Sequence, residues 1–77
     1  MKIVKLQTAV KNSDGLYIAG EMAAFNVDDV SGIVPVRNQY HSFRPVQELA
    51  EVVLKSGRSF VVNYRVNQAF AKIEEVM

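Results

Sequence analysis

The chain has no cysteine and no tryptophan, and its 77 residues include one histidine and two prolines. Without cysteine it can form neither a disulfide framework nor a thiolate metal site, and a single histidine cannot build a histidine-rich zinc site. We therefore expect no metal ion and no other cofactor. The lack of cysteine is also compatible with a reducing compartment.

The chain also lacks a clear excess of positive or negative charge. Its nine Lys and Arg residues nearly balance its eight Asp and Glu residues, and the formal net charge is +1. Duplex binding usually requires a dense positive field, so this balance disfavours non-specific nucleic-acid binding. Charged residues interrupt residues 1–7 every few positions, unlike the apolar run of a signal peptide or a membrane span. We expect a soluble, cytoplasmic protein with no membrane partner.

Hydrophobic residues, in contrast, make up 49% of the chain, which is enough for folding rather than disorder. The length allows one small domain, residues 1–77, and no more. A domain of this size buries a modest fraction of its surface, so small domains often gain core by oligomerising. We expect a homo-oligomer.

Residues 51–77 show the clearest pattern, a strand, a tight turn, a second strand and a closing helix. Gly57 can adopt positive φ without Cβ strain between two apolar segments, which is typical of a hairpin. Apolar residues then recur at steps of three and four, as on one face of a helix with Asn63 as the N-cap. The residues of that expected face are Val66, Ala69, Phe70, Ile73 and Met77.

The first half of the chain favours strands and turns. Alternating side chains, turn formers and β-branched runs predict strands over residues 2–10, 16–19, 23–27 and 30–36, with a turn at 11–15 and a bend at Asp28 and Asp29. Residues 20–25 also suit a helical turn, because alanine and methionine favour helices. Pro35 lacks an amide proton, so residues 30–36 belong at a sheet edge or a strand end.

Residues 46–56 are compatible with two structures. Val46, Leu49, Ala50, Val53 and Leu54 fit one helical face, with Pro45 at a helix start and Gly57 at a helix end. Val52 lies off that face, however, and β-branched residues beside a plausible turn favour a strand. Periodicity alone leaves both interpretations open.

A resemblance to a known protein family favours the strand interpretation of residues 46–56. Residues 51–62 read Glu-Val-Val-Leu-Lys-Ser-Gly-Arg-Ser-Phe-Val-Val and are followed by Val66, Phe70 and Ile73, a pattern that resembles the small FlbD-type proteins of flagellar operons. Residues 26–33 resemble that family's Asn-x-Asp-x-Ile-x-x-Ile segment, and short phage proteins share the layout. The resemblance implies a strand, a polar turn with glycine, a second strand and a helix, and it implies no catalytic residues.

An aromatic and basic segment is the strongest candidate for a partner-binding site: Arg37, Tyr40, His41, Phe43 and Arg44. Aromatic faces and guanidinium groups in one loop, residues 37–45, can anchor a protein or stack on bases. The alternative is that Tyr40 and Phe43 fold back and cover the sheet, because small domains need their large apolar side chains.

No motif for catalysis accompanies these residues. Asp28 and Asp29 are neighbours that point to opposite faces in an extended segment, so a turn or a cap explains them better than a shared proton or a metal. We expect no enzymatic activity, although a small hydrolase remains a third hypothesis.

The sequence thus predicts an α+β fold, an antiparallel sheet of four or five strands with one C-terminal helix packed on one face. The expected function is that of a non-enzymatic adaptor or regulator of phage or bacterial origin, which binds a protein partner or itself. The alternative is a single-stranded nucleic-acid-binding protein that uses residues 37–45.

Overall fold

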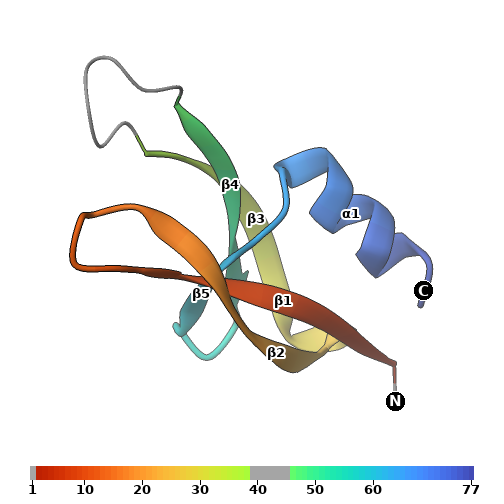
Figure 1. The fold of residues 1–77 in the computed structure, drawn as a ribbon. Coiled ribbons are helices and arrows are strands. Elements are labelled where there is room, and N and C mark those ends of the chain that lie inside the picture. Colours follow the sequence, from red (N-terminus) through yellow and green to blue (C-terminus); the bar gives the residue numbers. More distant parts are fainter. Residues whose placement is uncertain (1, 39–45) are drawn as a thin grey trace.

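Five antiparallel strands and one C-terminal helix form the α+β fold of the computed structural model, which describes residues 2–38 and 46–77 (Figure 1). The predicted fold class is confirmed. The elements are β1 (Ile3–Lys11), β2 (Tyr17–Asn26), the 3-10 helix η1 (Val27–Asp29), β3 (Val30–Asn38), β4 (Gln47–Leu54), β5 (Ser59–Val62) and α1 (Val66–Glu74). The strand order is β2-β1-β5-β4-β3, so β2 and β3 are the edges of the sheet.

Strand β5 joins two hairpins into one sheet. Strands β1 and β2 form the first hairpin, and β3 and β4 form the second. The contact between β1 and β5 is short: Thr8 pairs with Val62, and the Asn63 N–H donates to the Gln7 carbonyl oxygen at 2.8 Å. Chain-consecutive strands therefore lie side by side except at the η1 bend, where the chain passes from one hairpin to the other.

The core lies between the sheet and α1. Leu6, Val52 and Val62 are fully buried, and α1 adds Ala69 and Ile73 to the same cluster. The remaining members of this cluster are Val4, Phe25 and Ala50. The rings of Phe25 and Phe60 meet at a centroid distance of 5.3 Å and an interplanar angle of 60°, a tilted geometry that aromatic pairs favour.

The hairpin across Gly57 is confirmed, and with it the strand interpretation of residues 46–56. Gly57 has φ +92°, and its N–H donates to the Leu54 carbonyl oxygen at 3.0 Å. The Leu54 N–H in turn donates to the Arg58 carbonyl oxygen at 2.8 Å and closes the turn. The Cβ atoms of β4 alternate between the two sides of the sheet, which buries Ala50 and Val52.

Replacing Gly57 with valine is expected to lower the free energy of unfolding by about 1 kcal/mol or more, because a β-branched residue is strained at positive φ. Gly57→Asn is the matched control, since asparagine tolerates the left-handed region and should cost less. Thermal unfolding monitored by circular dichroism measures both. Equal melting temperatures for wild type and Gly57→Val would contradict the strained turn.

The first hairpin corrects one prediction. The strands expected over residues 16–19 and 23–27 are one continuous strand, β2. A β-bulge interrupts its alternation, because Gly20 and Glu21 together stand opposite Thr8. The Thr8 hydroxyl donates to the Glu21 carbonyl oxygen at 2.7 Å. The extra residue shifts the side-chain period by one, which is why the sequence resembles two separate strands.

The predicted bend at Asp28 and Asp29 is confirmed as η1. Asn26 begins this turn, and its Oδ1 atom accepts a hydrogen bond from the Asp28 N–H at 3.1 Å. Strand β3 then runs from Val30 to Asn38 along the sheet edge, so Pro35 lies on an edge strand as predicted. Because β3 includes Arg37 and Asn38, the expected loop does not begin at residue 37.

Two predictions for α1 were wrong. The N-cap is Arg65 rather than Asn63, whose side-chain amide instead donates to Gln7 Oε1 at 3.3 Å. Phe70 and Met77 are not on the buried face, because their exposed fractions are 45% and 68%.

The buried stripe of α1 explains this difference. It consists of the buried Ala69 and Ile73, with the partly buried Val66 beside them and the partly buried Val76 just beyond the end of α1. Phe70 is rotated by about 100° from Ala69 and by about 60° from Ile73, which places it at the outer side of that stripe. Residue 77 lies beyond the last helical residue, Glu74. Within residues 2–38 and 46–77, the structure has no helix with the length and apolarity that a membrane crossing requires.

Candidate protein-binding groove

Of the five predicted site residues, the structure places Arg37 near the end of β3. Tyr40, His41, Phe43 and Arg44 lie outside the described residues. Their role in partner binding stays a prediction, as does the alternative that Tyr40 and Phe43 cover the sheet.

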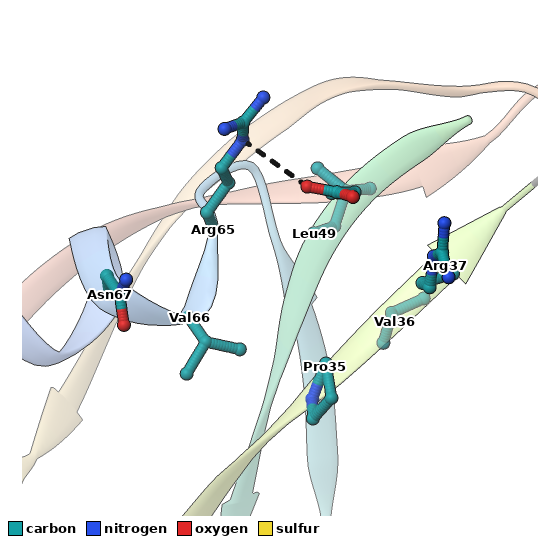
Figure 2. A pocket seen from close by; sticks show the side chains of 8 residues that line it. Pro35, Val36, Arg37, Leu49, Arg65, Val66 and Asn67 are labelled. Carbon is teal, nitrogen blue, oxygen red and sulfur yellow. Dashed lines mark ion pairs between the residues drawn. The ribbon is translucent and has the colours of Figure 1, made fainter. Parts of the chain in front are cut away.

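Two separate hollows lie along the boundary between α1 and the edge strand β3, and Arg37 lines one of them. We call this boundary, with its two hollows, the α1–β3 groove. The first, the arginine end, has a volume of about 440 Å³ and is lined by Pro35, Val36, Arg37, Glu48, Leu49, Arg65, Val66 and Asn67 (Figure 2). The second, the apolar end, has a volume of about 510 Å³ and is lined by Val27, Asp28, Val30, Ser31, Gly32, Ile33, Lys55, Phe70, Ile73, Glu74 and Met77.

The two hollows follow the same boundary. The start of β3 and the end of α1 line the apolar end, whereas the later part of β3 and the start of α1 line the arginine end. Strand and helix therefore run in opposite directions along the groove. A ligand that lies along this boundary would contact both hollows.

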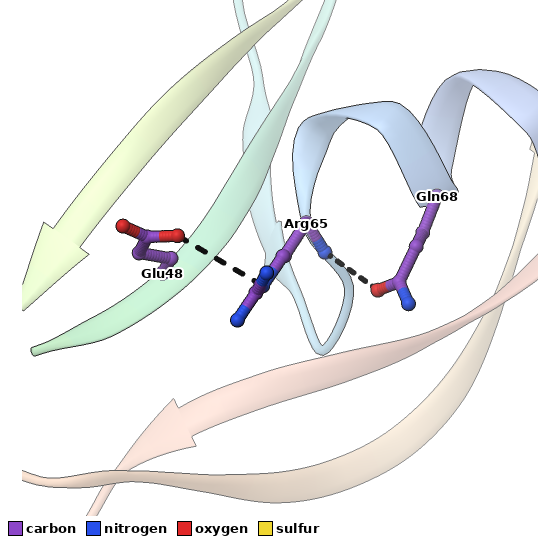
Figure 3. Close-up of polar contacts among 3 residues, drawn as sticks. All are labelled: Glu48, Arg65 and Gln68. Carbon is purple, nitrogen blue, oxygen red and sulfur yellow. Dashed lines mark hydrogen bonds and ion pairs between the residues drawn. The ribbon is translucent and has the colours of Figure 1, made fainter. Parts of the chain in front are cut away.

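A hydrogen bond and a packing contact hold the start of α1 in place. The Arg65 backbone N–H donates to Gln68 Oε1 at 3.0 Å, which satisfies a donor at the helix start (Figure 3). Val66 packs against the core, and its side chain extends toward the strands, near Pro35 (Figure 2). The wall of the arginine end is thus part of the packed structure.

Three charged side chains line the arginine end, those of Arg37, Glu48 and Arg65. Arg65 Nε lies 3.9 Å from Glu48 Oε2, with exposed side-chain fractions of 71% and 50% (Figure 3). Arg37 is the cross-strand neighbour of Glu48 in the β3–β4 ladder. Such an exposed pair contributes at most about 1 kcal/mol, so Arg65 can exchange Glu48 for another carboxylate at little cost. Two guanidinium groups here face one carboxylate.

The apolar end has a different character. Phe70 and Met77 expose apolar surface there, beside Ile33 and the partly exposed start of β3. The rim carries Asp28, Lys55 and Glu74. Sequence analysis missed this surface because it assigned Phe70 to the core. Helical spacing could not have revealed it, because Phe70 lies four positions after Val66 and three before Ile73 and so fits the same pattern.

A network of side-chain amides lies near the predicted loop. Gln47 Oε1 accepts from the Tyr17 N–H at 3.0 Å, and Gln47 Nε2 donates to the Tyr17 carbonyl oxygen at 2.9 Å. Asn38 Nδ2 donates to Gln47 Oε1 at 2.8 Å and to the Gly15 carbonyl oxygen at 3.0 Å. These bonds join the end of β3 and the start of β4 to Gly15 and Tyr17 of the first hairpin. The ends of β3 and β4 are thereby fixed against the first hairpin.

Gln47→Glu is expected to destabilise the protein by about 1 to 3 kcal/mol, because the carboxylate cannot donate to the Tyr17 carbonyl oxygen and would repel it. Gln68→Glu is the matched control, since Gln68 Oε1 only accepts and a glutamate suits that position. Urea denaturation of the three proteins measures the difference. If Gln47→Glu were as stable as Gln68→Glu at neutral pH, the network would be unimportant for stability.

In the part of the chain that the structure describes, no three potential metal-ligating side chains come together, and every buried side chain is apolar.

Comparisons with protein-family models, curated proteins and solved structures find no match to this chain. The resemblance to FlbD-type and phage proteins therefore stays a prediction. The fold and the α1–β3 groove remain as the basis for a functional proposal.

Proposed function

We propose that this protein is a non-enzymatic, cytoplasmic adaptor or regulator that binds a segment of a partner protein in the α1–β3 groove. The observation that carries the proposal is the exposure of Phe70, 45%, beside the apolar end. A domain of 77 residues gains stability from every large apolar side chain that it buries. An aromatic residue left at the mouth of an apolar hollow is well placed to bind a partner.

The edge strand supports the same proposal. Strand β3 pairs with β4 on one side and presents its other side at the sheet edge, where unpaired backbone groups can bind an extended segment. Pro35 removes one donor from this edge. We therefore expect side-chain contacts in the groove, rather than backbone pairing, to supply most of the affinity.

Site-specific photocrosslinking tests the groove. With benzoylphenylalanine in place of Phe70, irradiation in cells of the host should give a discrete adduct with one protein. The same group in place of Ile3, which is similarly exposed on β1, should not give this adduct. Adducts of equal pattern at both positions, or none at position 70, would contradict a protein-binding groove.

The nucleic-acid alternative makes a different prediction. If the protein binds single strands through Arg37 and its neighbours, retention on an immobilised oligonucleotide should fall steeply with salt, because phosphate contacts release counterions. Salt-dependent retention without any adduct at position 70 would favour this alternative.

Self-association belongs to the proposal as well, and β2 is the surface we expect to mediate it. Ile18 and Met22 are exposed on this ten-residue edge strand, which contains no proline, and Val10 stands opposite Ile18. Sedimentation should give a mass above 8.6 kDa at micromolar concentration. Ile18→Glu should return the mass to the monomer, whereas Val34→Glu on β3 should not. A wild-type mass of 8.6 kDa at all concentrations would rule out the oligomer.

A further inference from the structure

We propose that the ligand of the α1–β3 groove is an extended acidic peptide, in which an apolar side chain occupies the apolar end and a carboxylate about four residues away lies between Arg37 and Arg65. This inference rests on the proposed function and specifies the chemistry of its partner. It follows from the spacing of the two hollows and from the charges at each of them.

The four-residue spacing between the two side chains of the peptide follows from strand β3. Ile33 lines the apolar end and Arg37 lines the arginine end, four residues further along the same strand. At about 3.3 Å per residue, these positions are about 13 Å apart. An extended segment that lies along β3 has the same rise per residue, so its two contacting side chains are also about four positions apart. Both lie on the same side of the segment, because side chains alternate.

The charged residues at the two hollows determine the orientation of the bound peptide. At the arginine end, Arg37 and Arg65 outnumber Glu48, and the Arg65–Glu48 pair is long and exposed. At the apolar end, Lys55 is outnumbered by Asp28 and Glu74. A carboxylate is therefore favoured at the arginine end and disfavoured at the apolar end. The ligand should carry its acidic residue beside the end of β3 and its apolar residue beside the start.

Selection from a displayed library of random dodecapeptides on the full-length protein tests this inference. Binding peptides should share an apolar residue and an Asp or Glu four positions apart. Changing that acidic residue to its amide should weaken binding by about tenfold, as expected for the loss of two exposed ion pairs. The Phe70→Asp variant should lose binding altogether, and its melting temperature reports whether it stays folded.

Charge-neutral variants identify the residues responsible. The double variant Arg37→Gln and Arg65→Gln should bind the acidic peptide about tenfold more weakly and the amide peptide as well as wild type does. Arg58→Gln, an exposed arginine at the β4–β5 turn, is the matched control and should leave both affinities unchanged.

The outcomes separate the two proposals. Peptides that require Phe70 but show no acidic preference would overturn the inference and leave the proposed function intact. No selected peptide, or binding that is insensitive to Phe70→Asp, would overturn both. Selected peptides that match this chain's own sequence would overturn the inference in favour of a second copy as the ligand.

Discussion

Leu6→Ala is expected to leave the protein largely unfolded. Leu6 has no exposed surface and lies on β1 at the centre of the cluster that joins the sheet to α1. Truncating a fully buried leucine removes its transfer free energy and leaves a cavity, which together cost about 3 to 5 kcal/mol. A single domain of this length has a total stability of similar size. The variant should show weak cooperativity in thermal unfolding and collapsed dispersion in its proton NMR spectrum.

Phe70→Ala is the matched control for this prediction. It removes a larger side chain, yet nearly half of Phe70 is exposed, so the cost should be about 1 kcal/mol. The variant should therefore fold. The reverse order, a folded Leu6→Ala and an unfolded Phe70→Ala, would mean that α1 is rotated on the sheet and that Phe70 faces the core.

Gly20→Ala is expected to destabilise the first hairpin by about 1 to 3 kcal/mol through overpacking. A Cβ atom at position 20 would lie 2.7 Å from Thr8 Oγ1 and 3.3 Å from the Thr8 carbonyl oxygen. The Thr8 hydroxyl is held by its bond to the Glu21 carbonyl oxygen and cannot move aside without breaking it. The β-bulge thus leaves no room for a side chain. Denaturant unfolding measures the loss.

Gly32→Ala on β3 is the control, because a Cβ atom there meets nothing within 4 Å. It should be neutral, or stabilising by up to about 1 kcal/mol through the lower entropy of the unfolded chain. A double-mutant cycle sharpens the test: Thr8→Ala removes the closest clashing atom, so Gly20→Ala should cost less in that background. Equal costs in both backgrounds would contradict the clash.

Local chemistry was enough to predict the fold class, the turns at Gly15 and Gly57, the η1 bend and the edge position of Pro35. Each of these features depends on the backbone preferences of a few neighbouring residues, and those preferences act before any tertiary contact. For residues 46–56, local periodicity was compatible with a helix and a strand. In the structure this segment pairs with both β3 and β5 and is therefore a strand.

The candidate site was predictable only in part. Arg37 was identified from the sequence, and it does border the α1–β3 groove. Glu48 and Phe70 were not assigned to a site, because they come from separate elements that meet only when α1 packs beside β3. A helical pattern indicates which residues recur on one side, but one position changes the direction of a side chain by about 100°.

Tertiary packing therefore decided the features that matter most for function. The sequence by itself determined that the chain forms a small α+β domain with a C-terminal amphipathic helix, because turn chemistry and hydrophobic period are local properties. The docking of that helix decided that Ala69 and Ile73 are buried while Phe70 stays exposed. The reason is physical: neighbouring helix positions point in different directions, so when α1 packs on the sheet Ala69 and Ile73 join the hydrophobic cluster, while Phe70 stays at the apolar end of the groove.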